Sequence, residues 1–201
     1  MKLVVVGAHL RREDIEPVAE AVPVGEVFLS GVPVEDDQPL GDRELLLRVA
    51  RIRAELLERA TFVAIRYGFA SSSPAAKALP HAGRWKALLE EHRGRVEMTL
   101  KVAAANPKKR PDRRDFTSGA AYMRALHERT NVDDAFREEV ERTLVPLSVR
   151  HVWSAGELAM LIERAKLEEL REAGEKLKAT KVPFLLSGPW PLEVFADADR
   201  E

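Results

Sequence analysis

The side chains that most often carry out chemistry are few in this sequence of 201 residues. The histidines stand at no spacing typical of metal ligands, and the chain has no cysteine. These histidines are His9, His81, His92, His127 and His151. The cluster Ser71–Ser73 lacks the G-x-S-x-G pattern of a nucleophile elbow, so we interpret it as a loop between a strand and a helix.

Phosphate-binding loops and acid–base pairs are also missing from the sequence. Gly7 follows an apolar run, but neither G-x-G-x-x-G nor G-x-x-x-x-G-K-[ST] occurs. Asp36 and Asp37 are adjacent, and the side chains of neighbouring carboxylates diverge too readily to indicate a catalytic pair. We therefore expect a protein that is not an enzyme and that holds no cofactor and no metal.

The most unusual segment is SGPWP, at residues 187–191. Pro189 and Pro191 lack backbone N–H donors, so we expect the last strand to end before them. The two prolines also hold Trp190 on a stiff, extended backbone. A tryptophan held in this way either closes over the core or serves as a rigid anchor for a partner. Pro189, Trp190 and Pro191 are therefore candidate partner-binding residues.

Residues 105–116 form a polar connector that carries the main cluster of positive charge. Its basic residues are Lys108, Lys109, Arg110, Arg113 and Arg114. Asp112 and Asp115 dilute this charge, and no aromatic residue is interleaved for base stacking. We interpret the cluster as a solvated connector, with a contact to nucleic acid as the alternative.

The composition restricts the class of protein. The 32 lysines and arginines balance 33 aspartates and glutamates, which argues against a dedicated nucleic-acid binder. The longest apolar runs, for example Leu3–Ala8, are too short to span a bilayer, and the N-terminus lacks the features of a signal peptide. We expect a soluble cytoplasmic protein with one large domain or two small ones, which binds neither nucleic acid nor a membrane.

Hydrophobic patterns predict the elements that position these residues. In the first half we predict strands at 1–7, 24–34 and 61–70, and helices at 43–59 and before Gly94. Asp42 stands where a helix N-cap belongs, and the apolar residues of the first helix recur at helical spacing. Those residues are Leu45, Val49, Ile52 and Leu56.

The second half shows the clearest strand pattern, because apolar and polar residues alternate from Val96 to Val102. We predict helices at 118–130, 133–143 and 166–178, and strands at 147–153, 157–163 and 182–186. The run 158–162 suits a helix or a strand, and the preceding turn favours the strand. This order is that of a ferredoxin-like βαββαβ unit. We therefore predict an α+β fold of two small lobes, residues 1–94 and the ferredoxin-like residues 95–201.

The segment SGPWPLEVF resembles the C-terminal GPWPPYSF signature of the gas vesicle GvpL/GvpF family. Four further segments resemble motifs of that family in the same order along the chain. They are Phe62–Phe69 (FVAIRYGF, against LPLRFG), Leu88–Lys101 (LLEEHRGRVEMTLK, against L..L.G..E..LK), Ser118–Tyr122 (against SG..YL) and Leu158–Arg164 (LAMLIER, against LAYLV.R). Leu192 and Glu193 depart from the Pro-Tyr of the family signature.

The resemblance implies a two-lobed α+β protein that helps to form gas vesicles, the hollow protein-walled flotation organelles of some prokaryotes. Members of the family are non-enzymatic accessory or minor structural proteins, thought to contact the shell protein and other accessory proteins. We therefore predict these partners, at the gas vesicle or in the cytoplasm.

Two other functions remain open at this point. One is a small-ligand-binding or enzymatic protein with a pocket between the two lobes, for which Arg66 and Tyr67 are the first candidate binding residues. The other is a regulator that contacts nucleic acid through residues 108–114, in which case binding would weaken with added salt.

Overall fold

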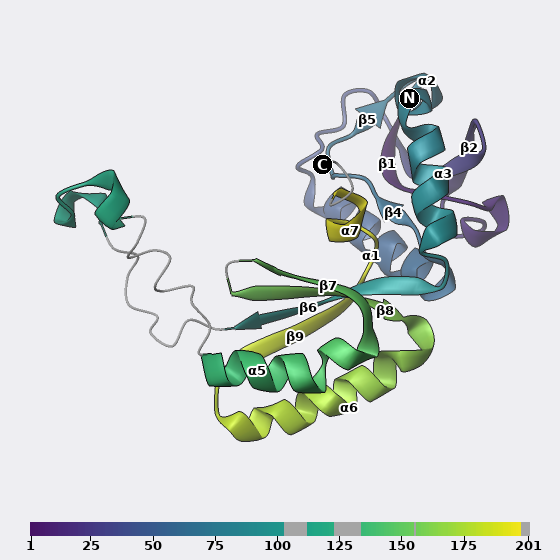
Figure 1. The fold of residues 1–201 in the computed structure, drawn as a ribbon. Helices are drawn as coiled ribbons and strands as arrows, with labels where there is room; N and C mark the ends of the chain where they lie inside the picture. Colours follow the sequence, from purple (N-terminus) through teal and green to yellow (C-terminus); the bar gives the residue numbers. More distant parts are fainter. Residues whose placement is uncertain (103–111, 123–133, 155, 198–201) are drawn as a thin grey trace. The chain divides into compact units, whose positions relative to one another are not determined.

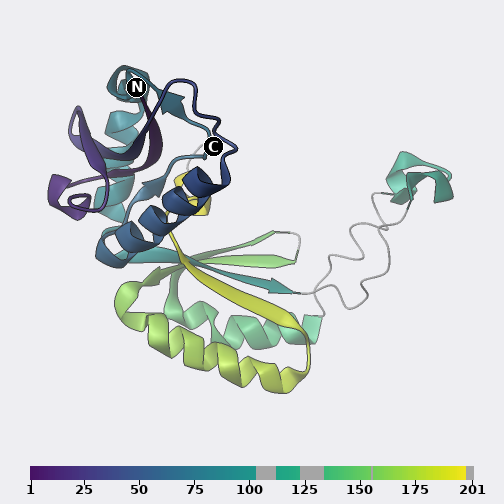
Figure 2. The same ribbon diagram turned by 180° about the vertical axis from the view of Figure 1, so that it is seen from behind.

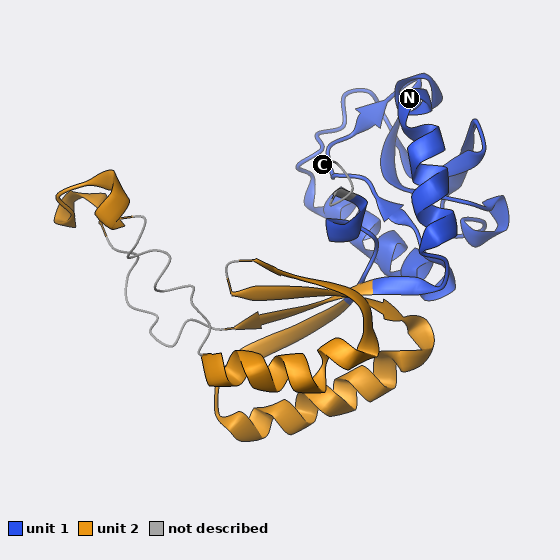
Figure 3. Cartoon of the chain, viewed as in Figure 1, with its two compact units in different colours: residues 1–96, 189–201 blue, residues 97–188 orange. Residues whose placement is uncertain are grey.

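The computed structural model describes residues 1–102, 112–122, 134–154 and 156–197, which form two compact units. Unit 1 comprises Met1–Val96 and Pro189–Glu201, and unit 2 comprises Glu97–Gly188 (Figure 3). Each unit contains one β-sheet and its own helices, as the predicted α+β fold of two lobes requires. The sequence assigned residues 189–201 to the second lobe, whereas the structure groups them with the first.

Unit 1 is built on a five-stranded antiparallel sheet (Figure 1). Its elements are β1 (Lys2–His9), η1 (Arg12–Asp14), β2 (Glu20–Val24), β3 (Val27–Val34), α1 (Arg43–Arg59), β4 (Val63–Ala64), β5 (Ala70–Ser71), α2 (Pro74–Ala78), η2 (Leu79–His81), α3 (Ala82–Glu91) and α7 (Val194–Asp197). The strand order is β2-β3-β1-β4, and β5 also pairs with β1. The buried central strand β1 therefore organises the unit.

Helix α1 forms as its sequence predicts. The carboxylate of Asp42 accepts a hydrogen bond from the Leu45 backbone N–H at 2.9 Å, which satisfies one of the free donors at the start of the helix. The predicted apolar face is buried, including Val49, Ile52 and Leu56. Both the N-cap and the buried face are thus confirmed.

The predicted strand 24–34 is β3, which begins at Val27, together with the turn that joins it to the end of β2. Val24 pairs with Val27 across a two-residue turn that starts at Gly25, whose φ is +57°. Glycine favours this left-handed conformation at a hairpin turn. The preceding strand β2 escaped prediction because Glu20 and Pro23 interrupt its apolar pattern, as is common in an edge strand.

The predicted strand 61–70 is wrong as a single element, because it consists of β4, β5 and a loop between them. Ala64 pairs with Gly7 and Ala70 pairs with Val4, so residues 65–69 stand opposite only Val5 and Val6 of β1. The extra residues must therefore leave the sheet. Backbone hydrogen bonds from Ile65 to Val6 (3.1 Å) and from Val5 to Phe69 (2.9 Å) hold the two ends of this loop.

Unit 2 has the predicted βαββαβ order. Its elements are β6 (Arg95–Val102), η3 (Arg113–Asp115), α5 (Asp134–Thr143), η4 (Val145–Leu147), β7 (Ser148–Ser154), β8 (Glu157–Glu163), η5 (Arg164–Lys166), α6 (Leu167–Leu177), η6 (Lys178–Thr180) and β9 (Phe184–Trp190). The sheet order is β7-β8-β6-β9, and α5 and α6 lie side by side on one face (Figures 1 and 2). This arrangement confirms the ferredoxin-like prediction.

The core of unit 2 lies between this sheet and its two helices. Met98 and Leu100 of β6 pack with Phe136 and Val140 of α5 in one buried apolar cluster. Alternate residues of β8 and the inner face of α6 complete the cluster: Leu158, Met160, Ile162, Leu170, Ala173 and Leu177. The ambiguous run 158–162 is therefore a strand, as the preceding turn indicated.

Strand β9 corrects one further expectation. We predicted that the strand would end before the two prolines, yet it runs through Gly188 and Pro189 to Trp190. Because β9 is an outer strand, a residue without an N–H donor can face the side that has no neighbour. Gly188 is required here, because its φ is +122° and an added Cβ atom would lie 2.6 Å from the Met98 sulfur.

Some predictions fall wholly or partly outside the described residues. Lys108, Lys109 and Arg110 of the basic connector lie there, while Arg113 and Arg114 are described and exposed. The helix predicted at 118–130 is described only to Tyr122. Residues 119–122 are helical, and Ser118 Oγ accepts a hydrogen bond from the Ala121 N–H at 3.1 Å.

Among the described helices, none has the length and apolar character needed to cross a bilayer.

Candidate functional site

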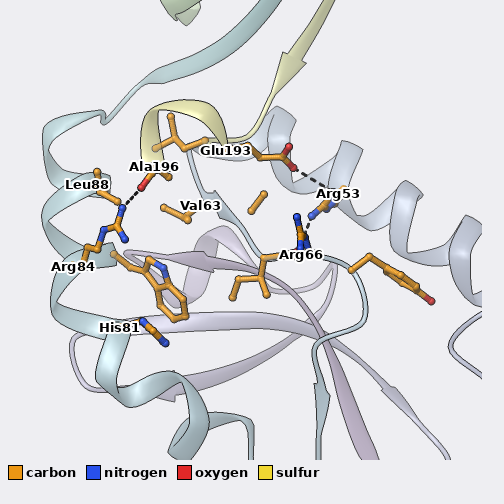
Figure 4. Close-up of a pocket in the computed structure, with 13 residues that line it drawn as sticks. Arg53, Val63, Arg66, His81, Arg84, Leu88, Glu193 and Ala196 are labelled. Atoms are coloured by element: carbon orange, nitrogen blue, oxygen red, sulfur yellow. Dashed lines mark hydrogen bonds and ion pairs between the residues drawn. The ribbon is translucent and has the colours of Figure 1, made fainter. Parts of the chain in front are cut away.

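Unit 1 contains a pocket of about 630 Å³ (Figure 4). It is lined by helix α1, strand β4 with the loop after it, the end of η2 with helix α3, and the C-terminal segment that includes α7. Its charged side chains are Arg53, Arg66, Arg84 and Glu193, and the rings of His81 and Trp85 also line it. Apolar side chains of Val63, Leu88 and Leu192 form another part of the wall.

The C-terminal segment closes one side of the pocket because it is fastened to β4. The Leu192 backbone N–H donates to the Phe62 carbonyl at 3.0 Å, and the Ala64 N–H donates to the Leu192 carbonyl at 3.1 Å. Leu192 thereby forms a parallel bridge with Val63, and the side chain of Phe195 is fully buried. These contacts explain why the residues after Gly188 belong to unit 1.

Arg53 and Arg84 each donate a hydrogen bond to a backbone carbonyl in the wall of the pocket. Arg53 Nη2 donates to the Ile65 carbonyl at 2.8 Å, and its Nη1 lies 3.6 Å from Glu193 Oε1. Arg84 Nη2 donates to the Ala196 carbonyl (Figure 4). The two guanidinium groups therefore link α1 and α3 to the C-terminal segment.

Arg66 and Tyr67, the two candidates from the sequence, lie together in the loop at residues 65–69 and line this pocket. The Tyr67 hydroxyl donates to the Leu40 carbonyl, and burial, together with the nearby Asp42 carboxylate, raises the pKa of Tyr67. The Arg66 carbonyl accepts a hydrogen bond from the Phe69 N–H at 3.4 Å, but the Arg66 side chain is exposed and its guanidinium has no hydrogen bond or ion pair with any other described residue. It is the lining arginine that is most available to a ligand.

Sequence reasoning missed Arg53, Arg84 and Glu193. Arg53 and Arg84 lie on helices rich in exposed charged residues, and Glu193 follows the unusual segment, so none stands out by type or spacing. The structure brings them together through the return of the chain after β9. A tertiary contact of this kind leaves no local pattern in the sequence.

The three candidates of the SGPWP segment do not line the pocket. Trp190 is 47% exposed at the end of β9, whereas Pro191 is buried and Pro189 is half-buried. Residues on both sides of Trp190 in the chain are held in place. Gly188 packs closely against Met98, and Pro191 is buried in unit 1. The ring of Trp190 is therefore exposed at the surface and does not cover a core.

The outer strands of the sheet in unit 2 expose further apolar side chains. Leu185 of β9 is 63% exposed, and Val149 and Val152 of β7 are also exposed. Outer strands present backbone groups on the side without a neighbour, which favours pairing with another strand. Each outer strand therefore combines exposed backbone with exposed apolar side chains.

His9 and Ser30 form a buried pair in the sheet of unit 1. His9 Nε2 lies 2.9 Å from Ser30 Oγ, which donates in turn to the Gly7 carbonyl, so the imidazole N–H is the donor to the serine. The His9 ring stacks on Phe62 with 4.9 Å between centroids, and burial lowers the pKa of His9 to about 3. Because both side chains are fully buried, this pair is structural.

The described part of the structure contains no cluster of potential metal ligands. Within residues 1–102, 112–122, 134–154 and 156–197, no group of three or more His, Asp or Glu side chains has an arrangement that could hold a metal ion.

Two crystal structures resemble this chain over nearly its whole length. They are those of the gas vesicle protein GvpF from Anabaena sp. PCC7120, with a TM-score of 0.69, and of GvpF from Microcystis aeruginosa, with a TM-score of 0.70. In each case the match covers 97% of this chain and 98% of the other chain. The chain has the GvpF fold.

This likeness extends across both units, since it covers more of the chain than either unit contains. The sequence identity to each GvpF structure is 12%. By sequence, neither a family model nor a curated protein matches the chain. The structural match therefore supports the resemblance first seen in the sequence motifs, at the level of the GvpF fold.

Proposed function

We propose that the chain is a gas vesicle accessory or minor structural protein that supports vesicle assembly through protein–protein contacts. The observation that carries this proposal is the match of 97% of the chain to two structures of gas vesicle proteins. The SGPWP segment and the four other motifs support it independently, because they come from the sequence alone. Its partners are the vesicle shell protein and other accessory proteins, and it acts without catalysis in the cytoplasm or at the vesicle.

Strand β9 and Trp190 are the contact elements that we favour. The strand is an outer one, and it exposes Leu185 and Trp190. A partner strand that pairs along β9 would gain backbone hydrogen bonds and cover these apolar side chains. Trp190 would contribute strongly, because a tryptophan on a fixed backbone loses little conformational freedom on binding.

Co-purification with the shell protein encoded in the same genome tests this proposal. The full chain should retain the shell protein, and Trp190→Ala should weaken retention about tenfold or more, as expected for a central interface residue. Leu79→Ala is the matched control, because Leu79 is 59% exposed in unit 1 and lies on neither outer strand of the sheet in unit 2. Failure of the wild-type chain to retain the shell protein would count against the proposal.

Small-ligand binding is the second candidate function. The sequence placed the pocket for this alternative between the two lobes, whereas the pocket that carries it lies within unit 1. Three arginines and an exposed histidine line it. A protein can have such a site and also act by contact with partners.

A further inference from the structure

We infer that the pocket of unit 1 is a binding site for a carboxylate attached to an apolar or aromatic group. The inference goes beyond the gas vesicle role and does not depend on it. It rests on the charge of the lining, on the donors that remain available, and on the apolar wall that faces them.

The lining carries an excess of positive charge. Arg53, Arg66 and Arg84 contribute three guanidinium groups to the lining and Glu193 contributes one carboxylate, which leaves a formal charge of +2 (three minus one) before His81 is considered. Charge of one sign on a concave surface concentrates oppositely charged ligands. The pocket therefore favours an anion.

The available donors indicate which anion. Arg53 and Arg84 already donate to carbonyls in the pocket walls, and Arg53 also lies near Glu193. Arg66 has no such partner among the residues described. Its planar guanidinium presents two parallel N–H donors, which match the two oxygens of one carboxylate. Arg53 and Arg84 would then contribute charge from fixed positions.

The remaining wall suits an apolar group next to that carboxylate. Trp85 is half-buried, and its ring lies 5.5 Å from the His81 ring, centroid to centroid, with an angle of 34° between the planes. Leu88 and Leu192 line the pocket with them, and both are buried. A ligand that places an aromatic or branched apolar group against this wall would remove apolar surface from water.

Nuclear magnetic resonance of the ¹⁵N-labelled full chain tests the inference through the indole N–H signals of its tryptophans. The signal of Trp85 is assigned by its loss in Trp85→Phe. Benzoate should shift the Trp85 signal and leave the Trp153 signal unchanged, because Trp153 lies in unit 2. Benzamide has the same shape without the charge, and inorganic phosphate has charge without an apolar group. Both should bind about tenfold more weakly than benzoate.

Variants separate the role of Arg66 from a general effect of charge. Arg66→Gln should weaken benzoate binding about fivefold. Arg51→Gln is the matched control, because Arg51 is an exposed arginine of α1 that does not line the pocket, and it should leave binding unchanged. Glu193→Gln should strengthen binding about twofold, since it removes the carboxylate that competes for Arg53.

A carboxylate of this kind occurs in small organic acids and in acidic protein segments, and a pair of peptides distinguishes these sources. The peptides are acetyl-Leu-Glu-Leu-amide and its Gln counterpart. Binding of benzoate and of the Glu peptide would assign the site to an acidic segment, and binding of benzoate alone would assign it to a small acid. The inference is overturned if benzoate leaves the Trp85 signal unshifted, if benzamide or phosphate binds as well as benzoate, or if Arg66→Gln binds benzoate normally.

Discussion

The two units of this protein differ in the residues that they bury and in the surfaces that they expose. Unit 2 packs an apolar cluster between its sheet and its helices and also buries the side chain of Glu97, and the outer strands of its sheet expose apolar side chains. Unit 1 buries a histidine–serine pair and holds an arginine-lined pocket. The strand pairing that we propose would use the sheet of unit 2, and the carboxylate recognition that we propose would use the pocket of unit 1.

Removing the anchor of the C-terminal segment should produce the largest effect, and it should fall on unit 1. Phe195 is fully buried, so Phe195→Ala should lower the free energy of unfolding by about 3–5 kcal/mol. Native-state hydrogen exchange would locate the loss of stability, and we expect amides of β1 and β3 to lose more protection than amides of β8. Val194→Ala, at an exposed position of the same helix, should change stability by about 0.5 kcal/mol or less. Greater loss of protection in β8 would contradict the grouping of this segment with unit 1.

A substitution at Gly188 should affect unit 2 instead. Gly188→Ala forces a Cβ atom to within 2.6 Å of the Met98 sulfur and 3.0 Å of the Glu97 carbonyl, at a φ of +122°. We expect a loss of about 2–3 kcal/mol, measured by denaturant unfolding and by exchange in β6. Gly83→Ala is the control, because its Cβ would meet nothing within 4 Å and helix α3 should gain about 0.5–1 kcal/mol. If Gly188→Ala had the stability of the wild type, the close packing of this position against Met98 and Glu97 would be contradicted.

Acid should destabilise unit 1 through His9. The pKa of His9 is about 3 in the folded chain, against 6.5 for an ordinary histidine, so between these values the unfolded chain binds a proton that the folded chain does not. The contribution of His9 is present above pH 6.5 and is lost as the pH falls toward 3, by about 1.4 kcal/mol for each unit below 6.5. At pH 5 this amounts to about 2 kcal/mol. Unfolding titrations from pH 7 to pH 4.5 measure it.

His9→Gln is the control for this prediction. Glutamine retains an N–H donor for Ser30 but has no group that titrates in this range, so the stability of unit 1 should depend less steeply on pH. Equal slopes for the wild type and His9→Gln would place the acid sensitivity elsewhere in the chain.

The comparison also explains which parts of the structure could be predicted from the sequence. Unit 2 follows from local patterns, because β6 alternates and the inner faces of α5 and α6 repeat at helical spacing. Those patterns lead directly to its βαββαβ order. Helix α1 of unit 1 was predicted for the same reason.

The pocket could not be predicted in this way. Residues 65–69 leave the sheet because their number exceeds that of the opposing residues in β1, and a pairing mismatch between distant segments is invisible to local periodicity. Arg66 and Tyr67 were candidates from the sequence, but Arg53 and Arg84 lie on two helices far apart in the chain and reach the pocket only through tertiary contacts with Ile65, Glu193 and Ala196. The prolines near β9 misled the prediction because an outer strand tolerates them.

Counting gas vesicles after deletion of the gene tests the central claim most directly. Electron microscopy of the host should show few or no vesicles in the deletion strain, and the wild-type gene should restore them. The Trp190→Ala gene should restore them poorly, because it lacks the exposed ring at the end of β9. A deletion strain with as many vesicles as its parent would contradict the proposed role in vesicle assembly.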